Sequence, residues 1–196
     1  MMELLNALEH SGYAMWVKES STAYVVVLAF HTIGLSFLVG ISGATALRVL
    51  GAARSMPLAP MEDFFPLMFV GLWINVFTGA VLLTLYPTQY VVDPIIYIKL
   101  TAIVAAMVLL RKLKSHLFGT GSNPEQAADT PRAKRLAASM LLAWLVATIC
   151  GRVTAYDLAT RLQTVAAFII VLGAALLIGY FVGRSLGWIR PADRYG

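Results

Sequence analysis

The chain has 196 residues, of which 59% are hydrophobic and 13% charged, and its mean hydropathy of +0.77 is typical of an integral membrane protein. Its single cysteine, Cys150, excludes an intramolecular disulfide framework and a cysteine-cluster metal site. The net charge of +5 is not carried by any soluble basic domain, so we expect no nucleic-acid partner.

The first 20 residues, MMELLNALEHSGYAMWVKES, lack a basic region and a small-residue cleavage site, so we expect them to be retained. Leu4, Leu5 and Leu8 share one side of the segment 3–8, which predicts a short helix lying in the membrane interface. Trp16 follows as an anchor at the level of the lipid headgroups.

Five apolar stretches follow, each long enough to cross a hydrocarbon core of about 30 Å. The one long polar stretch, 118–131, predicts a solvent-exposed loop, and TQYVVDP predicts a short return loop. The expected fold class is all-α, an integral membrane bundle of five transmembrane helices preceded by a short interfacial helix, forming a single domain over 1–196. The spans are predicted over about 22–50, 63–86, 94–117, 132–156 and 162–187.

Lysine and arginine residues are distributed unevenly between the two sides that five spans create. Four lie on the N-terminal side, namely Lys18, Lys99, Arg152 and Arg161. Because cytoplasmic segments are enriched in lysine and arginine, we expect the N-terminus outside, the C-terminus in the cytoplasm and the 118–131 loop cytoplasmic. The eleven on that cytoplasmic side are Arg48, Arg54, Arg111, Lys112, Lys114, Arg132, Lys134, Arg135, Arg184, Arg190 and Arg194.

Span one contains a histidine, His31, about ten residues from its outer end, or roughly 14 Å along a helix. An ionisable side chain at this depth is a candidate functional residue. At 100° per residue it shares a face with Gly34, Leu38, Ser42 and Thr45. Ser36, Gly40 and Ala44 have the spacing that allows helix backbones to approach, which predicts a second helix contact.

Other polar residues fall at comparable depths in the later spans. Asn75 and Thr78 lie about as deep as His31, whereas Lys99 and Arg152 lie closer to the outer surface, and Tyr156 shares the face of Arg152. A b-type haem needs an imidazole for its iron and cations for its propionates. The sequence therefore predicts a haem b site with His31 as axial ligand, Lys99 and Arg152 at the propionates, Asn75 or Thr78 as orienting groups, and Tyr156 as a further cofactor-binding residue.

Simpler interpretations of each residue remain open. His31 can hydrogen-bond across helices, and Asn75 can serve helix packing. Lys99 and Arg152 can extend into the headgroup region, and Arg152 can instead pair with Asp157. His10 follows the interfacial helix and is either a surface residue or, folded over the bundle, the second axial ligand, with Met15 a weaker candidate. His116, among cytoplasmic cations, is expected to be solvated.

Several runs carry a resemblance to a known family: WVKESSTAYVVVLAFHTIGLSFLVGISGATALRVLG, FVGLWINVFTGAVLL, DPIIYIKLTAIV and GRVTAY. They resemble an uncharacterised family of small bacterial inner-membrane proteins across spans one to four. The residues that match are Trp16, Glu19, Ser20, His31, Gly34, Leu50, Gly51, Thr78, Gly79, Asp93, Pro94, Lys99, Gly151 and Arg152. The resemblance implies a bacterial inner membrane, with a periplasmic N-terminus.

The chain is more distantly similar to the membrane domain of copper-resistance protein D and to the bacterial membrane protoporphyrinogen oxidase. The latter similarity implies haem binding through an intramembrane histidine. Where that oxidase brings a second partner from another helix, this chain supplies only Lys99. We therefore expect a membrane-embedded haem b redox or electron-transfer subunit with a redox partner subunit or a second copy. The alternatives are a copper-resistance-type metal or anion transport protein and a structural membrane subunit.

Overall fold

The computed structural model describes residues 1–154 and 156–185, and the chain divides into two compact units, Met1–Gly151 and Arg152–Gly196. We describe each unit by itself, and a single domain over 1–196 stays a prediction. Arg190, Arg194 and the predicted end of span five at 187 lie outside the described residues.

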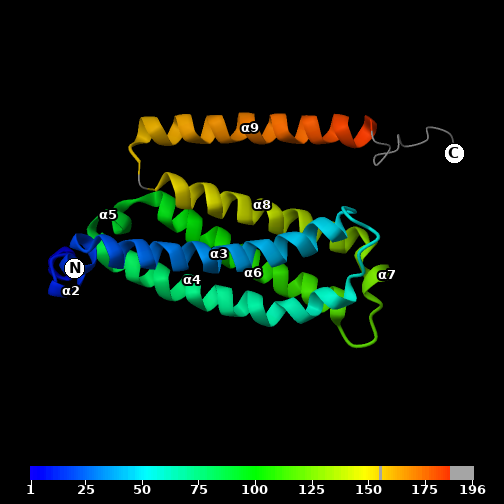
Figure 1. Cartoon of the computed structure of the whole chain (residues 1–196), viewed down its shortest axis with the longest axis horizontal. Coiled ribbons are helices and arrows are strands. Elements are labelled where there is room, and N and C mark those ends of the chain that lie inside the picture. The colour runs from blue at the N-terminus through cyan, green and yellow to red at the C-terminus, as the bar shows by residue number, and fades with distance from the viewer. Residues whose placement is uncertain (155, 186–196) are drawn as a thin grey trace. The chain divides into compact units, whose positions relative to one another are not determined.

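In the described part of the chain, five helices are long and apolar enough to cross a membrane, which confirms an all-α, multi-pass membrane protein (Figure 1). No strand occurs in residues 1–154 or 156–185. Four of these elements begin in the first unit, and α9 belongs to the second. Their bounds are Ser21–Val49 for α3, Ala59–Phe64 for η1 continuing into Phe65–Leu85 for α4, Pro94–Phe118 for α6, Pro131–Val153 for α8 and Leu158–Ser185 for α9.

The last two spans differ from their predicted bounds. Helix α8 ends at Val153 rather than at 156, and α9 begins at Leu158 rather than at 162. Asp157 explains the early start of α9, because its carboxylate accepts a hydrogen bond from the Thr160 side chain and others from backbone N–H groups. These hydrogen bonds lower the pKa of Asp157.

The N-terminal segment forms two helices, where the sequence predicted one. Helix α1 covers Met2–Glu9 and α2 covers Gly12–Glu19, which contains Trp16. Ser11 separates them, since its hydroxyl accepts the backbone N–H of Ala14 at 3.2 Å and so caps α2. The tryptophan side chain is 62% exposed, as an interfacial anchor requires.

The predicted return loop contains a further short helix, α5, over Pro87–Val92. Proline suits the first position of a helix because its missing N–H would have no partner there. Thr88 of α5 donates a hydrogen bond to the Glu9 carboxylate, and this bond lowers the pKa of Glu9. Lys18 lies 3.7 Å from Glu9 Oε1 and 4.6 Å from the centroid of the Tyr86 ring. The N-terminal helices are therefore held against α5.

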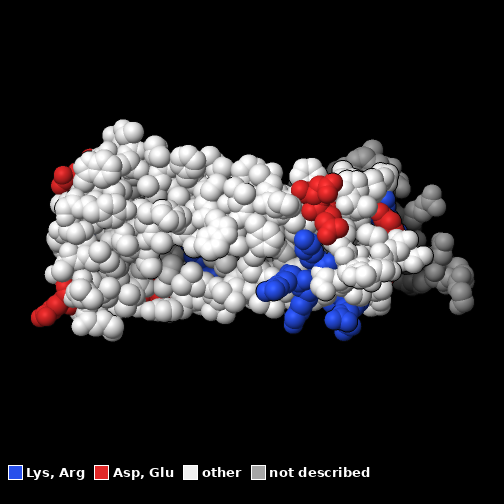
Figure 2. All heavy atoms as spheres, turned by 90° about the horizontal axis from the view of Figure 1, so that it is seen from below, with Lys and Arg blue, Asp and Glu red and all other residues white. Residues whose placement is uncertain are grey.

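The polar segment predicted as a loop also contains a helix, α7, over Pro124–Ala128. Glu125 of α7 binds two groups, accepting from Arg48 Nη2 at 2.6 Å and from the backbone N–H of Leu58 at 2.8 Å. Arg48 also donates from Nε to the Met56 carbonyl at 2.6 Å. We call the end of the first unit that carries Arg48, Lys114 and α7 the basic end, and Figure 2 shows lysine and arginine gathered near one end of an otherwise largely uncharged face.

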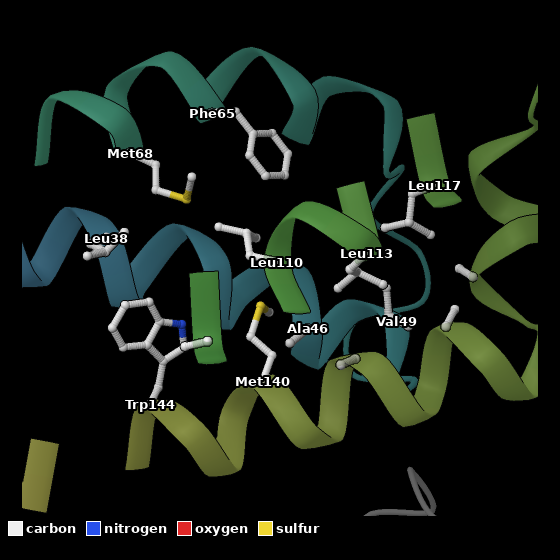
Figure 3. Packing of buried hydrophobic residues seen from close by; sticks show 14 of the residues in the cluster. Leu38, Ala46, Val49, Phe65, Met68, Leu110, Leu113, Leu117, Met140 and Trp144 are labelled. Carbon is white, nitrogen blue, oxygen red and sulfur yellow. The ribbon is translucent and has the colours of Figure 1, made fainter. Parts of the chain in front are cut away.

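The core of the first unit is built by α3, α4, α6 and α8. Figure 3 shows Leu38, Met68, Leu110 and Trp144 pointing inward from these helices, and each is at most 3% exposed. The indole N–H of Trp144 is buried without a hydrogen-bond partner among the described residues. The buried face of α3 is the one that the spacing of Gly34, Leu38, Ser42 and Thr45 predicted.

Helices α3 and α4 approach most closely at two glycines. A Cβ atom added to Gly34 would lie 2.7 Å from the Gly71 carbonyl oxygen, and one added to Gly71 would lie 2.8 Å from the Gly34 oxygen. The predicted contact through Ser36, Gly40 and Ala44 is wrong within the first unit, where all three residues are exposed. Bulky neighbours on that face, such as Phe37 and Ile33, are also exposed.

Gly34→Ala is expected to destabilise the protein by about 1–3 kcal/mol, as overpacked sites do, because its new methyl group would meet the α4 backbone. Gly40→Ala is the matched control on the same helix, since nothing lies within 4 Å of its added Cβ. The stability of the Gly40→Ala variant is expected to stay unchanged or to rise slightly, because alanine has a higher helix propensity than glycine. Thermal unfolding in detergent compares the two, and equal melting temperatures would contradict the close approach.

Candidate functional site

The His31 side chain lies between α3 and α4, half-buried. Its Nδ1 is 2.9 Å from the hydroxyl oxygen of Thr78 on α4. The ring also lies against the α4 backbone, because a Cβ atom added to Gly79 would stand 3.3 Å from His31 Cε1. This contact is tight, so a side chain at position 79 would require the imidazole to shift by a few tenths of an ångström.

The hydrogen bonds of Thr78 determine which nitrogen of neutral His31 carries the proton. The Thr78 hydroxyl has one hydrogen, which it donates to the Ile74 carbonyl at 2.6 Å. With that hydrogen on the carbonyl, the Thr78 oxygen accepts from Nδ1–H of His31, and we assign the tautomer on this basis. A neutral ring protonated at Nδ1 has its lone pair on Nε2. Among the described residues nothing hydrogen-bonds to Nε2, and that atom is not among the fully buried ones.

Asn75 contacts the backbone of His31 and not its imidazole. Its Nδ2 donates to the His31 carbonyl oxygen at 2.9 Å, across the α3–α4 contact. Of the two interpretations that the sequence left open, this geometry is that of a helix-packing hydrogen bond. The His31 carbonyl lies about one helical turn from Gly34. The hydrogen bond from Asn75 to this carbonyl therefore fixes the position of His31 along α4.

Lys99 of α6 is half-buried, and its charge interacts electrostatically with His31 and Cys150. The side chain lies over the backbone of α8, because a Cβ atom added to Gly151 would stand 3.5 Å from Lys99 Nζ. In the part of the chain that the structure describes, no carboxylate lies within 4.0 Å of this ammonium group. A cation so placed inside a bundle is costly unless an anion accompanies it.

Arg152 and Tyr156 belong to the second unit, so their predicted roles beside His31 stay predictions. Both side chains are exposed, and Tyr156 lies beyond the end of α8. No ion pair joins Arg152 to Asp157 within residues 1–154 and 156–185. Asp157 caps α9 instead, which answers one of the alternatives for Arg152.

The other candidate ligands have contacts that do not include His31. His10 is exposed, and its Nδ1 bonds the Asn6 carbonyl of its own helix at 2.9 Å. Met15 is also exposed, so neither is brought to the imidazole. His116 is half-buried rather than fully solvated, with Nε2 2.8 Å from the Thr130 hydroxyl that caps α8.

Sequence reasoning missed three neighbours of the candidate site: Gly79, Cys150 and Gly151. The glycines lie against the side chains of His31 and Lys99, and Cys150 lies within electrostatic reach of Lys99. Two features of the sequence could have indicated these glycines. Gly79 directly follows Thr78, and Gly151 lies at about the same depth in its span as Lys99 does in its own. A pattern of small residues alone does not say which side chain they accommodate.

Comparison of the chain with protein-family models, with curated proteins and with solved structures gives no match. The membrane class therefore rests on the five apolar helices. The candidate site rests on the contacts of His31 and Lys99.

Thr78→Val is expected to release the proton from Nδ1 of His31, because valine offers no acceptor. Nitrogen NMR of protein with labelled histidine reports the change, as the two ring nitrogens exchange their protonated and unprotonated signals. Thr84→Val is the matched control on α4, since that hydroxyl bonds only its own helix, at the Val81 carbonyl. An unchanged tautomer in Thr78→Val would contradict the assignment.

Proposed function

We propose that this protein is a membrane-embedded redox or electron-transfer subunit that binds a b-type haem through His31. The observation that supports the proposal is the 2.9 Å contact between His31 Nδ1 and the Thr78 hydroxyl, because a hydrogen bond donated from Nδ1–H leaves the Nε2 lone pair for an iron ligand. Histidines that ligate metals commonly donate their other ring N–H to a second protein group in this way. When bound, the haem supplies one-electron redox chemistry.

Lys99 supports the proposal through its charge. The half-buried ammonium lacks a carboxylate partner in the described part of the chain and interacts electrostatically with His31. A haem propionate is an anion of the kind that such a position favours. The roles of Arg152 as a second propionate partner and of His10 as a second axial ligand remain proposals that rest on the sequence alone.

The unpaired Lys99 charge also favours a second candidate, an anion transport role in which Lys99 and His31 line a path. A protein-only metal centre, as in the copper-resistance alternative, has less support. In the described residues no group of three or more His, Cys, Asp or Glu side chains lies close enough to hold a metal ion. A haem needs only one or two protein ligands.

The proposal has a simple spectroscopic test. Protein expressed with ample haem is expected to show a Soret band, which His31→Gly abolishes because the iron loses its ligand. Free imidazole added to His31→Gly is expected to restore the band by filling the vacated space. His116→Ala is the control and is expected to keep it, since that histidine serves the cap of α8.

A colourless wild-type protein would reject haem binding. Anion uptake by such a protein, lost in Lys99→Leu, would support the second candidate. A band that survives in His31→Gly without imidazole would reject His31 as the ligand. A colourless protein in which His31→Gly only lowers the melting temperature would instead assign His31 a structural role.

We further propose a bacterial inner-membrane location with a periplasmic N-terminus and a cytoplasmic C-terminus, on the uneven distribution of lysine and arginine. A redox role needs an electron donor and an acceptor, so a redox partner subunit or a second copy belongs to the proposal.

A cysteine placed at Ser122, in a Cys150→Ala background, is expected to resist a membrane-impermeant thiol reagent in intact cells and to react after lysis. The exposed position of Ser122 makes it accessible from whichever side it occupies. A cysteine at Ser21, exposed near the start of α3, is the control expected to react in intact cells. Labelling at Ser122 from outside would reverse the proposed orientation.

A further inference from the structure

A groove of about 770 Å³ runs between α4 and α6 in the first unit. Its floor contains Phe65, Met68 and Leu110, which are at most 3% exposed and which Figure 3 shows among the packed core side chains. Its rim contains Phe69, Val104 and Val108, which are 45–62% exposed. A groove with a packed apolar floor and an apolar rim is suited to a hydrocarbon chain lying along it.

The length of the groove matches one leaflet of a bilayer. Its lining begins at Ile103 on α6 and ends at Lys114, and these eleven helical steps span about 16 Å. On α4 the lining runs from Phe65 to Val76, which is the same distance. Half of a hydrocarbon core of about 30 Å is about 15 Å. An acyl chain reaching from the headgroups to the midplane therefore fits the groove along its length.

The charged side chains that line the groove, Arg111 and Lys114, both lie at its basic end. Arg111 is exposed, and no carboxylate in the described residues lies within 4.0 Å of it. Lys114 is partly neutralised, with Glu62 Oε1 at 3.9 Å and the Phe65 ring centroid at 4.8 Å. An arginine guanidinium binds phosphate oxygens in pairs, so Arg111 is the stronger phosphate ligand.

We propose that this groove is a binding site for one anionic phospholipid, with an acyl chain between α4 and α6 and the headgroup phosphate on Arg111, assisted by Lys114. A zwitterionic lipid offers the same chain but no net negative charge, so the site discriminates by headgroup. The proposal is independent of haem binding, because the groove residues and the contacts of His31 do not overlap.

Native mass spectrometry of the purified chain in detergent tests the site, with phosphatidylglycerol and phosphatidylcholine of identical acyl chains as probes. One phosphatidylglycerol per chain is expected to bind more tightly than phosphatidylcholine. Arg111→Gln is expected to weaken phosphatidylglycerol binding about fivefold, the effect of losing about one interfacial cation. Lys112→Gln is the matched control, since this neighbouring cation on α6 does not line the groove.

The apolar part of the site has its own pair of variants. Val108→Trp is expected to block the groove and to weaken binding of both lipids, whereas Leu100→Trp, equally exposed to lipid on α6 but outside the groove, is not. Unchanged melting temperatures verify that each variant is folded. Equal binding of the two lipids, equal effects of Arg111→Gln and Lys112→Gln, or displacement of the lipid by inorganic phosphate at equimolar concentration would each overturn the proposal.

Discussion

The contact between the backbones of α3 and α4 at Gly34 and Gly71 is the interaction on which the rest of the site depends. Lipid surrounds the bundle, so helices associate through close packing and hydrogen bonds rather than through the hydrophobic effect. The two glycines bring the helices near enough for Asn75 to reach the His31 carbonyl and for Thr78 to reach the His31 ring. A wider separation would remove both hydrogen bonds together.

The polar groups around His31 differ in how many of their hydrogen bonds are made within the protein. Thr78 uses its one hydrogen on its own helix and its oxygen on His31, which leaves Nε2 as an open acceptor. Lys99 brings a positive charge near the same imidazole. Ionisable groups inside a membrane are costly and are associated with function, and on this ground we propose a ligand at this nitrogen and this charge.

The two ends of the first unit are held by different kinds of interaction. At one end Glu9 joins the N-terminal helices to Thr88 and Lys18. At the basic end Glu125 neutralises Arg48 and binds the backbone of Leu58. Arg111, in contrast, is an exposed cation beside an apolar groove, where we propose that it binds a lipid phosphate.

The sequence by itself determined the five apolar helices, the buried face of α3 and His31 as the candidate residue, because hydrophobic length and helical period depend only on residue order. It did not distinguish Gly34 from Gly40, since both lie in small-residue patterns on the same helix. Only the tertiary structure decided that Gly34 meets α4, that Thr78 fixes the His31 proton and that Asn75 binds backbone. These depend on the rotation and separation of two helices, and spacing along one helix does not specify its partner.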